Sequence, residues 1–198
     1  MQCLGRPLLA LVTCVALTSR AKAEGWTIGA ETLSDRAPGN FGESTATKFQ
    51  VNAERTFASG AVIGGSFEPQ IKADNQEVSY NLEATLGYMW KLNQLGSFGG
   101  SAGVGQRFQQ ESSGGNFSYY VVRVRADIDL SERWSWNVIT YRFRDAFNTA
   151  NDYNTPEAST TITLKFDQSS SVYLKYYYAW KDGSPDNQGI GMGWKHSF

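Results

Sequence analysis

Cysteine and histidine are scarce in this 198-residue sequence, which contains two cysteines, Cys3 and Cys14, and one histidine, His196. Both cysteines lie in the first 23 residues, which we interpret below as a segment removed on export. The mature chain can therefore form neither a disulfide framework nor a thiolate metal site. The lone histidine has no second ligand-type residue beside it in the sequence. We expect no metal and no cofactor.

Long apolar runs are also missing from most of the chain. Beyond residue 23, no run approaches the roughly 18 to 20 apolar residues that a membrane-spanning helix needs. The one extended run, at residues 8–17, follows Arg6 and precedes the small-x-small sequence Ala21-Lys22-Ala23. This order is typical of a secretory signal peptide and its cleavage site. The sequence thus predicts a signal peptide at 1–23 and a single mature domain at 24–198.

A net positive charge is absent as well. The whole sequence has 18 Lys and Arg residues against 19 Asp and Glu residues. Removing the signal peptide takes away three basic residues, Arg6, Arg20 and Lys22, and no acidic one, which leaves 15 basic against 19 acidic residues. A mature net charge near −4 argues against nucleic acid as a partner.

The sequence is rich in segments where polar and apolar residues alternate with a period of two. This alternation is clearest at residues 77–90, where seven apolar side chains share one face of the predicted strand. These are Val78, Tyr80, Leu82, Ala84, Leu86, Tyr88 and Trp90. Such a stripe is long for a soluble strand and suits the roughly 9 to 11 residues of a tilted membrane strand.

The same alternation predicts ten strands. They lie at residues 26–34, 45–57, 61–71, 77–90, 97–109, 158–167, 172–180 and 189–198, with two more in a hairpin at 117–144. Long connections at 35–44, 72–76, 110–116, 145–157 and 182–187 alternate with tight turns after Phe57, Trp90, Leu130 and Gln168. Long loops on one side and short turns on the other, with both termini on the short side, are typical of outer-membrane barrels.

The sequence therefore predicts an all-β, antiparallel transmembrane β-barrel of about ten strands, with eight or twelve as alternatives. A secreted soluble sandwich is the competing fold. In a sandwich every apolar stripe would need a second sheet to cover it, whereas lipid covers all of them at once. The glycines from Gly99 to Gly105 further predict a strand that bends or whose backbone another group approaches closely.

The two ends of the predicted strands carry different side chains. Six aromatic residues fall at the short-turn end and predict an interfacial girdle: Trp26, Phe57, Trp90, Phe98, Trp134 and Phe198. The last strand ends on an aromatic residue after apolar residues at every second position, which resembles the C-terminal strand of bacterial outer-membrane β-barrels. This resemblance implies that Trp194 and Phe198 belong to a signal read by the barrel assembly machinery. It also implies a location in the outer membrane, in contact with its lipid.

Catalytic residues are not evident. His196 lies on the apolar face next to the C-terminus, so we interpret it as a girdle residue. We expect no base near the serine-rich turn at 169–171. The paired carboxylates of a glycosidase cannot be recognised from spacing alone. We expect that the protein is not an enzyme.

Arginines mark the hairpin at 117–144. If its turn brings Leu130 opposite Ser135, Arg123 faces Arg142 and Arg125 faces Thr140. Like charges directly opposite each other are destabilising. Acidic side chains across the lumen, water or an anionic ligand must therefore offset them.

Charges on the predicted inner face are sorted by strand. Basic residues concentrate on the fifth to seventh strands, and we call this set the arginine track: Arg107, Arg123, Arg125, Arg142 and Arg144. Lys165, Lys175 and Lys195 follow. Acidic residues gather on the first four strands: Glu31, Glu54, Glu68, Glu77 and Glu83. This sorting predicts a transverse field across the lumen, with mutual pairing that plugs a narrow barrel as the alternative.

A family resemblance rests on the run YYVVRVRADIDLSERWSWNVITYRFRDAF and the terminal WKHSF. Together they resemble the oligogalacturonate-specific porin family of narrow monomeric channels. The resemblance implies that Arg123, Arg125, Arg142 and Arg144 line a pore that guides acidic oligosaccharides. The N-terminal half matches only in its barrel pattern, and that family has twelve strands.

The sequence thus predicts a small outer-membrane barrel that is a narrow passive channel for small anionic solutes or acidic oligosaccharides. In that function the arginine track would select the solute. The alternative is a plugged structural or adhesive barrel whose extracellular loops bind a partner.

Overall fold

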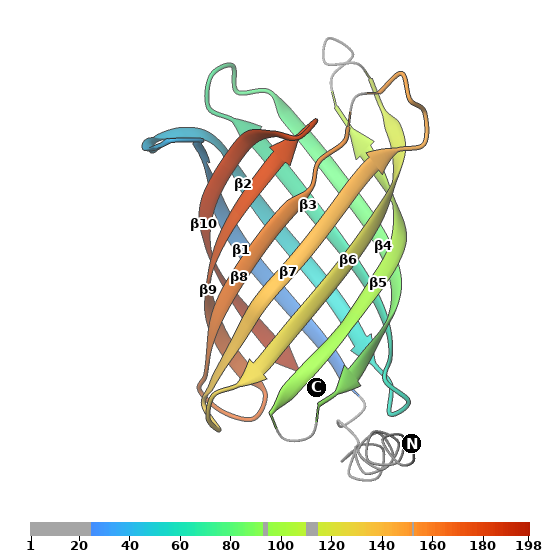
Figure 1. Cartoon of the computed structure of the whole chain (residues 1–198), viewed down its shortest axis with the longest axis vertical. Helices are drawn as coiled ribbons and strands as arrows, with labels where there is room; N and C mark the ends of the chain where they lie inside the picture. Colours follow the sequence, from blue (N-terminus) through green and yellow to red (C-terminus); the bar gives the residue numbers. More distant parts are fainter. Residues whose placement is uncertain (1–24, 93–94, 110–114, 152) are drawn as a thin grey trace, which may run out of the picture.

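The computed structural model describes residues 25–92, 95–109, 115–151 and 153–198, and over these residues the chain is a closed barrel of ten antiparallel strands (Figure 1). The strands are β1 (Gly25–Ala37), β2 (Asn40–Thr56), β3 (Ala61–Lys72), β4 (Val78–Lys91), β5 (Gly96–Phe108), β6 (Phe117–Asp129), β7 (Trp134–Ala146), β8 (Glu157–Lys165), β9 (Ser170–Lys181) and β10 (Ser184–Ser197). Strands adjacent in sequence pair with each other, and β1 pairs with β10 to close the barrel. The predicted barrel is confirmed. The predicted signal peptide lies outside the described residues.

Apolar side chains point outward and polar side chains point into the lumen. On β4, Leu86 is 65% exposed on the outside, whereas Asn81 is 2% exposed on the inside. A single closed sheet has no second sheet to cover this outer apolar surface, so the soluble sandwich is excluded. Such an apolar outer surface is suited to contact with membrane lipid. In the part of the chain that is described, no helix is long and apolar enough to span a bilayer.

The connections define two ends of the barrel. The short connections at 57–60, 92–95, 130–133 and 166–169 lie at what we call the turn end, where β1 begins and β10 finishes (Figure 1). The other end is the loop end. The predicted connections at 72–76 and 145–157 are confirmed to within two residues. Most of the predicted connection at 110–116 lies outside the described residues.

The predicted long connections at 35–44 and 182–187 are wrong, because the strands continue and meet in tight turns. Asp182 and Gly183 both have positive φ, 50° and 77°, as the central residues of a type I′ hairpin turn require. β1 and β2 likewise turn at Pro38 and Gly39, and Gly39 has a φ of 77°. In Figure 1 the tip of the β1–β2 hairpin leans away from the barrel wall.

The arginine hairpin, β6–β7, has the predicted pairing in its central part. Arg123 lies opposite Arg142, and Arg125 lies opposite Thr140. The assumed pairing at the turn is wrong by one residue, since Ser135 lies opposite Asp129 rather than Leu130. A register shift between Ala126 and Asp127 restores the predicted pairing, which is the effect of a β-bulge.

Candidate functional site

The arginine track lies on the inner wall, but its two β7 members are buried. Arg142 and Arg144 belong to the buried charged residues, and Arg144 is only 4% exposed. Their strand places them in the lumen because they alternate with Tyr141 and Phe143 on the outer face. Guanidinium groups so far removed from water need anionic partners.

Those partners come from the opposite wall. Nη1 of Arg144 lies 3.1 Å from Oε1 of Glu68 on β3, and Nη2 lies 2.5 Å from Oε1 of Glu83 on β4. β3 and β7 are separated by three strands on one side of the barrel and by five on the other, so the Arg144–Glu68 pair crosses the lumen. The same two carboxylates also meet Arg123, which pairs with Glu83, and Arg142, whose Nη1 is 3.8 Å from Oε2 of Glu68.

A further acid completes this group. Nη2 of Arg142 donates a hydrogen bond of 2.6 Å to Oε2 of Glu157, the first residue of β8. We call the whole group the central network: Glu68, Glu83, Arg123, Arg142, Arg144 and Glu157. The repulsion between the facing arginines is therefore offset by acidic side chains, one of the three predicted possibilities. The sequence pattern assigns Glu157 to the preceding loop and so does not predict it as a lumen residue. It is nevertheless an even number of positions from the inward Lys165, which places both on the same face of β8.

A repeated three-strand unit surrounds the central network. An inward tyrosine lies opposite a glycine on the next strand, and that glycine lies opposite an acid on the third. In each unit the tyrosine hydroxyl donates a hydrogen bond to the acid. The three units are Tyr119–Gly105–Glu83, Tyr173–Gly193–Glu31 and Tyr177–Gly189–Asp35.

The glycines allow the tyrosine rings to lie against the wall. A Cβ added at Gly105 would be 2.3 Å from the ring of Tyr119, and one at Gly193 would be 2.3 Å from the ring of Tyr173. Such contact between an aromatic ring and a cross-strand glycine is known to fix strand register. The predicted close approach to the glycine-rich fifth strand is thus confirmed at Gly105. Because the rings follow the wall, they do not extend across the lumen.

The remaining predicted acids are distributed along the lumen. Glu31 lies 3.5 Å from Nζ of Lys175, and Glu54 on β2 lies 3.7 Å from Nη1 of Arg125 on β6. Glu77 is at the loop end, 2.7 Å from Nζ of Lys72. The predicted opposition of a basic and an acidic wall therefore exists, but its charges meet in ion pairs. Asp35 and Lys48, 2.7 Å apart, are a further pair that the sequence did not single out.

Arg107 differs from the other four arginines of the track. It has no carboxylate in ion-pair contact among the described residues, and its hydrogen bonds go to Ser79 (2.9 Å), Asn81 (3.1 Å) and Gln109 (2.9 Å). Its guanidinium group lies over the ring of Tyr153, 5.3 Å from the centroid. With Lys72 and Glu77 it lines a small polar pocket of about 80 Å³ at the loop end.

Tyr153 brings the long connection between β7 and β8 into the mouth of the barrel. Its ring packs 5.0 Å from both Phe117 and Tyr119, and its hydroxyl donates a 3.3 Å hydrogen bond to Oδ1 of Asn81. From the sequence this segment is expected to be only a long loop. A single tyrosine among Asn, Asp and Thr residues was the signal available.

At the turn end, His196 lies among aromatic residues as predicted. Its ring stacks on Trp194, with centroids 5.7 Å apart, and meets the edge of Phe198 at 4.7 Å. The role of Trp194 and Phe198 in assembly stays a prediction. The expectation that the serine-rich turn has no base nearby is wrong, because Oγ of Ser170 lies 3.0 Å from Nδ1 of His196.

This serine–histidine pair does not have the geometry of a catalytic triad, which needs a third group to orient the histidine. Among the described residues, no acid is hydrogen-bonded to His196; the nearby Asp167 instead accepts the backbone N–H groups of Ser169 and Ser170, each at 2.7 Å. These bonds lower the pKa of Asp167 from its ordinary value. Across the described residues, no group of three His, Cys, Asp or Glu side chains could hold a metal ion.

Comparison with known proteins gives a likeness of fold. No family model and no curated protein matches the chain. The NanC porin is 9% identical with a TM-score of 0.51, over 86% of this chain and 100% of the porin. The β domain of the Bordetella autotransporter BrkA is 11% identical with a TM-score of 0.51, over 89% of this chain and 100% of that domain. The KdgM porin is 13% identical over 87% of this chain and 99% of the porin, with a TM-score of 0.48. The fold is that of outer-membrane β-barrels.

Proposed function

We propose that this barrel is a narrow passive channel of the outer membrane, with the central network as its constriction and small anions as its preferred solutes. The observation that carries the proposal is the construction of the inner wall. Charged, amide and hydroxyl side chains follow it from one end to the other, while its tyrosine rings lie on wall glycines instead of across the lumen. A water-filled path needs both features.

The preference for anions follows from the one arginine of the track without a carboxylate partner among the described residues. Arg107 places at the loop-end mouth a positive charge that pairs with no carboxylate of the described residues, and low-dielectric walls focus its field there. The other four arginines are in contact with acids and contribute less. The anion preference therefore belongs to the mouth, and the narrow central network favours small solutes over oligosaccharides.

Reversal potentials in a planar bilayer under a salt gradient test this proposal. The parent protein is expected to prefer anions, and Arg107→Gln should lose most of that preference. Arg55→Gln is the matched control, because Arg55 lies on the outer face with its guanidinium group over the ring of Phe57. Higher salt should weaken the preference, since the screening length falls from about 10 Å at 0.1 M to about 3 Å at 1 M. Cation preference in the parent would contradict the proposal.

A plugged barrel is the second candidate, and a specific observation favours it. Arg144 and Glu68 meet across the lumen, and both are buried, at 4% and 3% exposure. Barrels of about eight strands hold only packed side chains in their interior, whereas an aqueous channel is assured only at about sixteen. In this case the barrel would be structural or adhesive, with its loops binding a partner. A correctly folded sample that carries no current would support it.

A further inference from the structure

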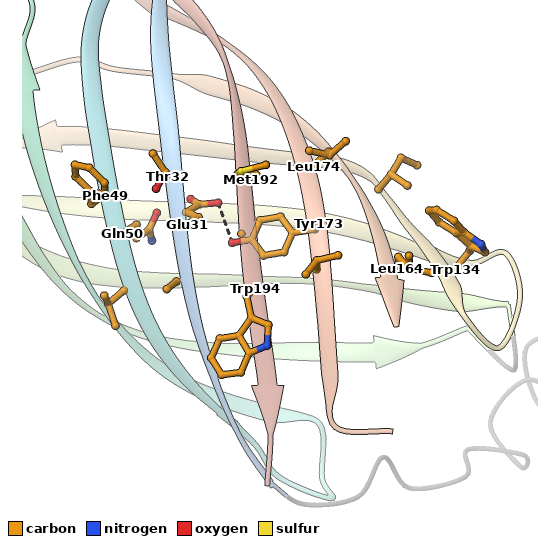
Figure 2. A pocket seen from close by; sticks show the side chains of 15 residues that line it. Glu31, Thr32, Phe49, Gln50, Trp134, Leu164, Tyr173, Leu174, Met192 and Trp194 are labelled. Atoms are coloured by element: carbon orange, nitrogen blue, oxygen red, sulfur yellow. Dashed lines mark hydrogen bonds between the residues drawn. The ribbon is translucent and has the colours of Figure 1, made fainter. Parts of the chain in front are cut away.

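The outer wall has an apolar hollow of about 660 Å³ on the turn-end half of the barrel. Its lining side chains come from β2, β1, β10, β9 and β8, with Trp134 of β7 at one edge. Figure 2 shows them across these neighbouring strands, together with the hydrogen bond between Tyr173 and Glu31. The outer wall of a barrel is normally convex, so a hollow of this size calls for an explanation.

Side chains of unequal size on neighbouring strands form the hollow. On β1 the outward residues are the small Ala30 and Thr32. Thr32 lies opposite Phe49 on β2 and opposite Met192 on β10. Ala30 likewise has Trp194 opposite it on β10. β1 is thus the floor of a trough between two rows of large side chains.

We propose that this groove binds an acyl chain of a phospholipid, held longer than the lipids around the rest of the barrel. The groove lies within the outer apolar surface that faces lipid, and Leu174 and Met192, both strongly exposed, line it. A flexible hydrocarbon chain can follow an irregular trough. Contact with a second copy of this chain fits less well, because a two-fold interface places the same patch on both partners. Two hollows would then face each other and leave the space unfilled.

The turn-end edge of the groove suits a lipid headgroup. Trp134 and Trp194 lie at this edge, and tryptophan is enriched where a membrane meets water. Arg133, exposed in the β6–β7 turn, directly precedes Trp134. A cation beside an interfacial tryptophan is placed to attract a phosphate group. The proposed lipid therefore has its phosphate near Arg133 at the turn end, and its acyl chain runs from there through the groove across β8, β9 and β10 towards β1. The proposal is independent of whether the lumen conducts.

Native mass spectrometry of the detergent-extracted protein tests the groove. The parent, folded in bilayers of phosphatidylethanolamine and phosphatidylglycerol, is expected to retain one phospholipid per chain. Ala30→Trp should fill the groove and lose that adduct. Ala102→Trp is the matched control, because Ala102 is also an exposed, outward alanine, on β5 away from the groove. Heat-modifiable migration on gels shows that each variant is folded.

Labelling by a phospholipid with a diazirine on its acyl chain gives a second, independent measurement. Peptides that contain Leu174 or Met192 are expected to be labelled more than those that contain Leu82 or Leu86 on the opposite wall. Equal labelling of both walls, or equal retention of lipid by Ala30→Trp and Ala102→Trp, would overturn the proposal. A two-chain mass that Ala30→Trp abolishes would assign the groove to a second copy and would also overturn it.

Discussion

At the scale of single residues, alternation decides which side chains meet lipid and which meet the lumen. The effect of a substitution therefore changes sharply between adjacent positions. Leu86→Arg is expected to lower the free energy of unfolding by about 2 to 4 kcal/mol if Leu86 lies near the bilayer midplane. Gln50→Arg should cost less, because Gln50 points inward and is only partly buried. Urea titration of the protein in lipid vesicles measures both, and equal costs would contradict the in/out assignment.

Inward positions are nevertheless not uniformly tolerant. Alternation alone marks Asn81 as an inward polar residue that an arginine could replace at little cost. In the structure it donates a 3.0 Å hydrogen bond to Glu68 and accepts from Arg107 and Tyr153. Replacing Asn81 would disturb three partners. Alternation therefore predicts the face on which a residue lies but not the residues that it contacts.

Gly105 tests the tyrosine–glycine contact directly. Gly105→Ala would place a Cβ 2.3 Å from the ring of Tyr119, and overpacking of this kind costs about 1 to 3 kcal/mol. Gly42→Ala is the control, since its added Cβ would meet only Oδ1 of Asn40, at 3.4 Å. Urea unfolding should separate the two variants. Indistinguishable midpoints would show that the ring moves aside without cost.

At the scale of elements, the β6–β7 hairpin depends on the acids that face it. Glu83→Gln should destabilise the barrel by about 3 to 5 kcal/mol, the usual cost of leaving a buried charge without its partner. The double variant Glu83→Gln/Arg123→Gln should lose much less stability than the sum of the losses of the two single variants. Lys165 and Asp129, an exposed pair 3.3 Å apart, provide the control cycle, with coupling of about 0 to 1 kcal/mol. Additive effects for Glu83 and Arg123 would contradict the role of the network.

The elements show where sequence reasoning succeeds and where it stops. Period two located all ten strands, because each strand separately meets lipid on one side and the lumen on the other. It cut β1, β2 and β10 short, since their loop-end parts have no apolar stripe to reveal them. The Asp182-Gly183 pair was a recognisable turn signal. The contact of Arg144 with Glu68, 76 residues away, depends on closure of the barrel and has no local signal.

At the scale of the whole molecule, the last strand both closes the barrel and carries the predicted assembly signal. The backbone N–H of Phe198 donates a 2.8 Å hydrogen bond to the carbonyl of Trp26, which ties the two ends of the chain together. Deleting Phe198 is expected to lower the amount of protein in the outer membrane while export to the periplasm continues. Cell fractionation with heat-modifiable migration measures this, and unchanged levels would contradict the assembly signal.

The whole barrel places opposite charges on opposite walls. We propose above that the resulting ion pairs form the constriction of a narrow channel. Single-channel recording of the parent beside Glu68→Ser/Arg144→Ser tests that claim most directly, because the double change removes the pair that crosses the lumen without leaving either charge alone. The parent is expected to pass a small, anion-preferring current, and the variant a larger one. A folded parent that passes no current, or a variant with unchanged conductance, would contradict the claim.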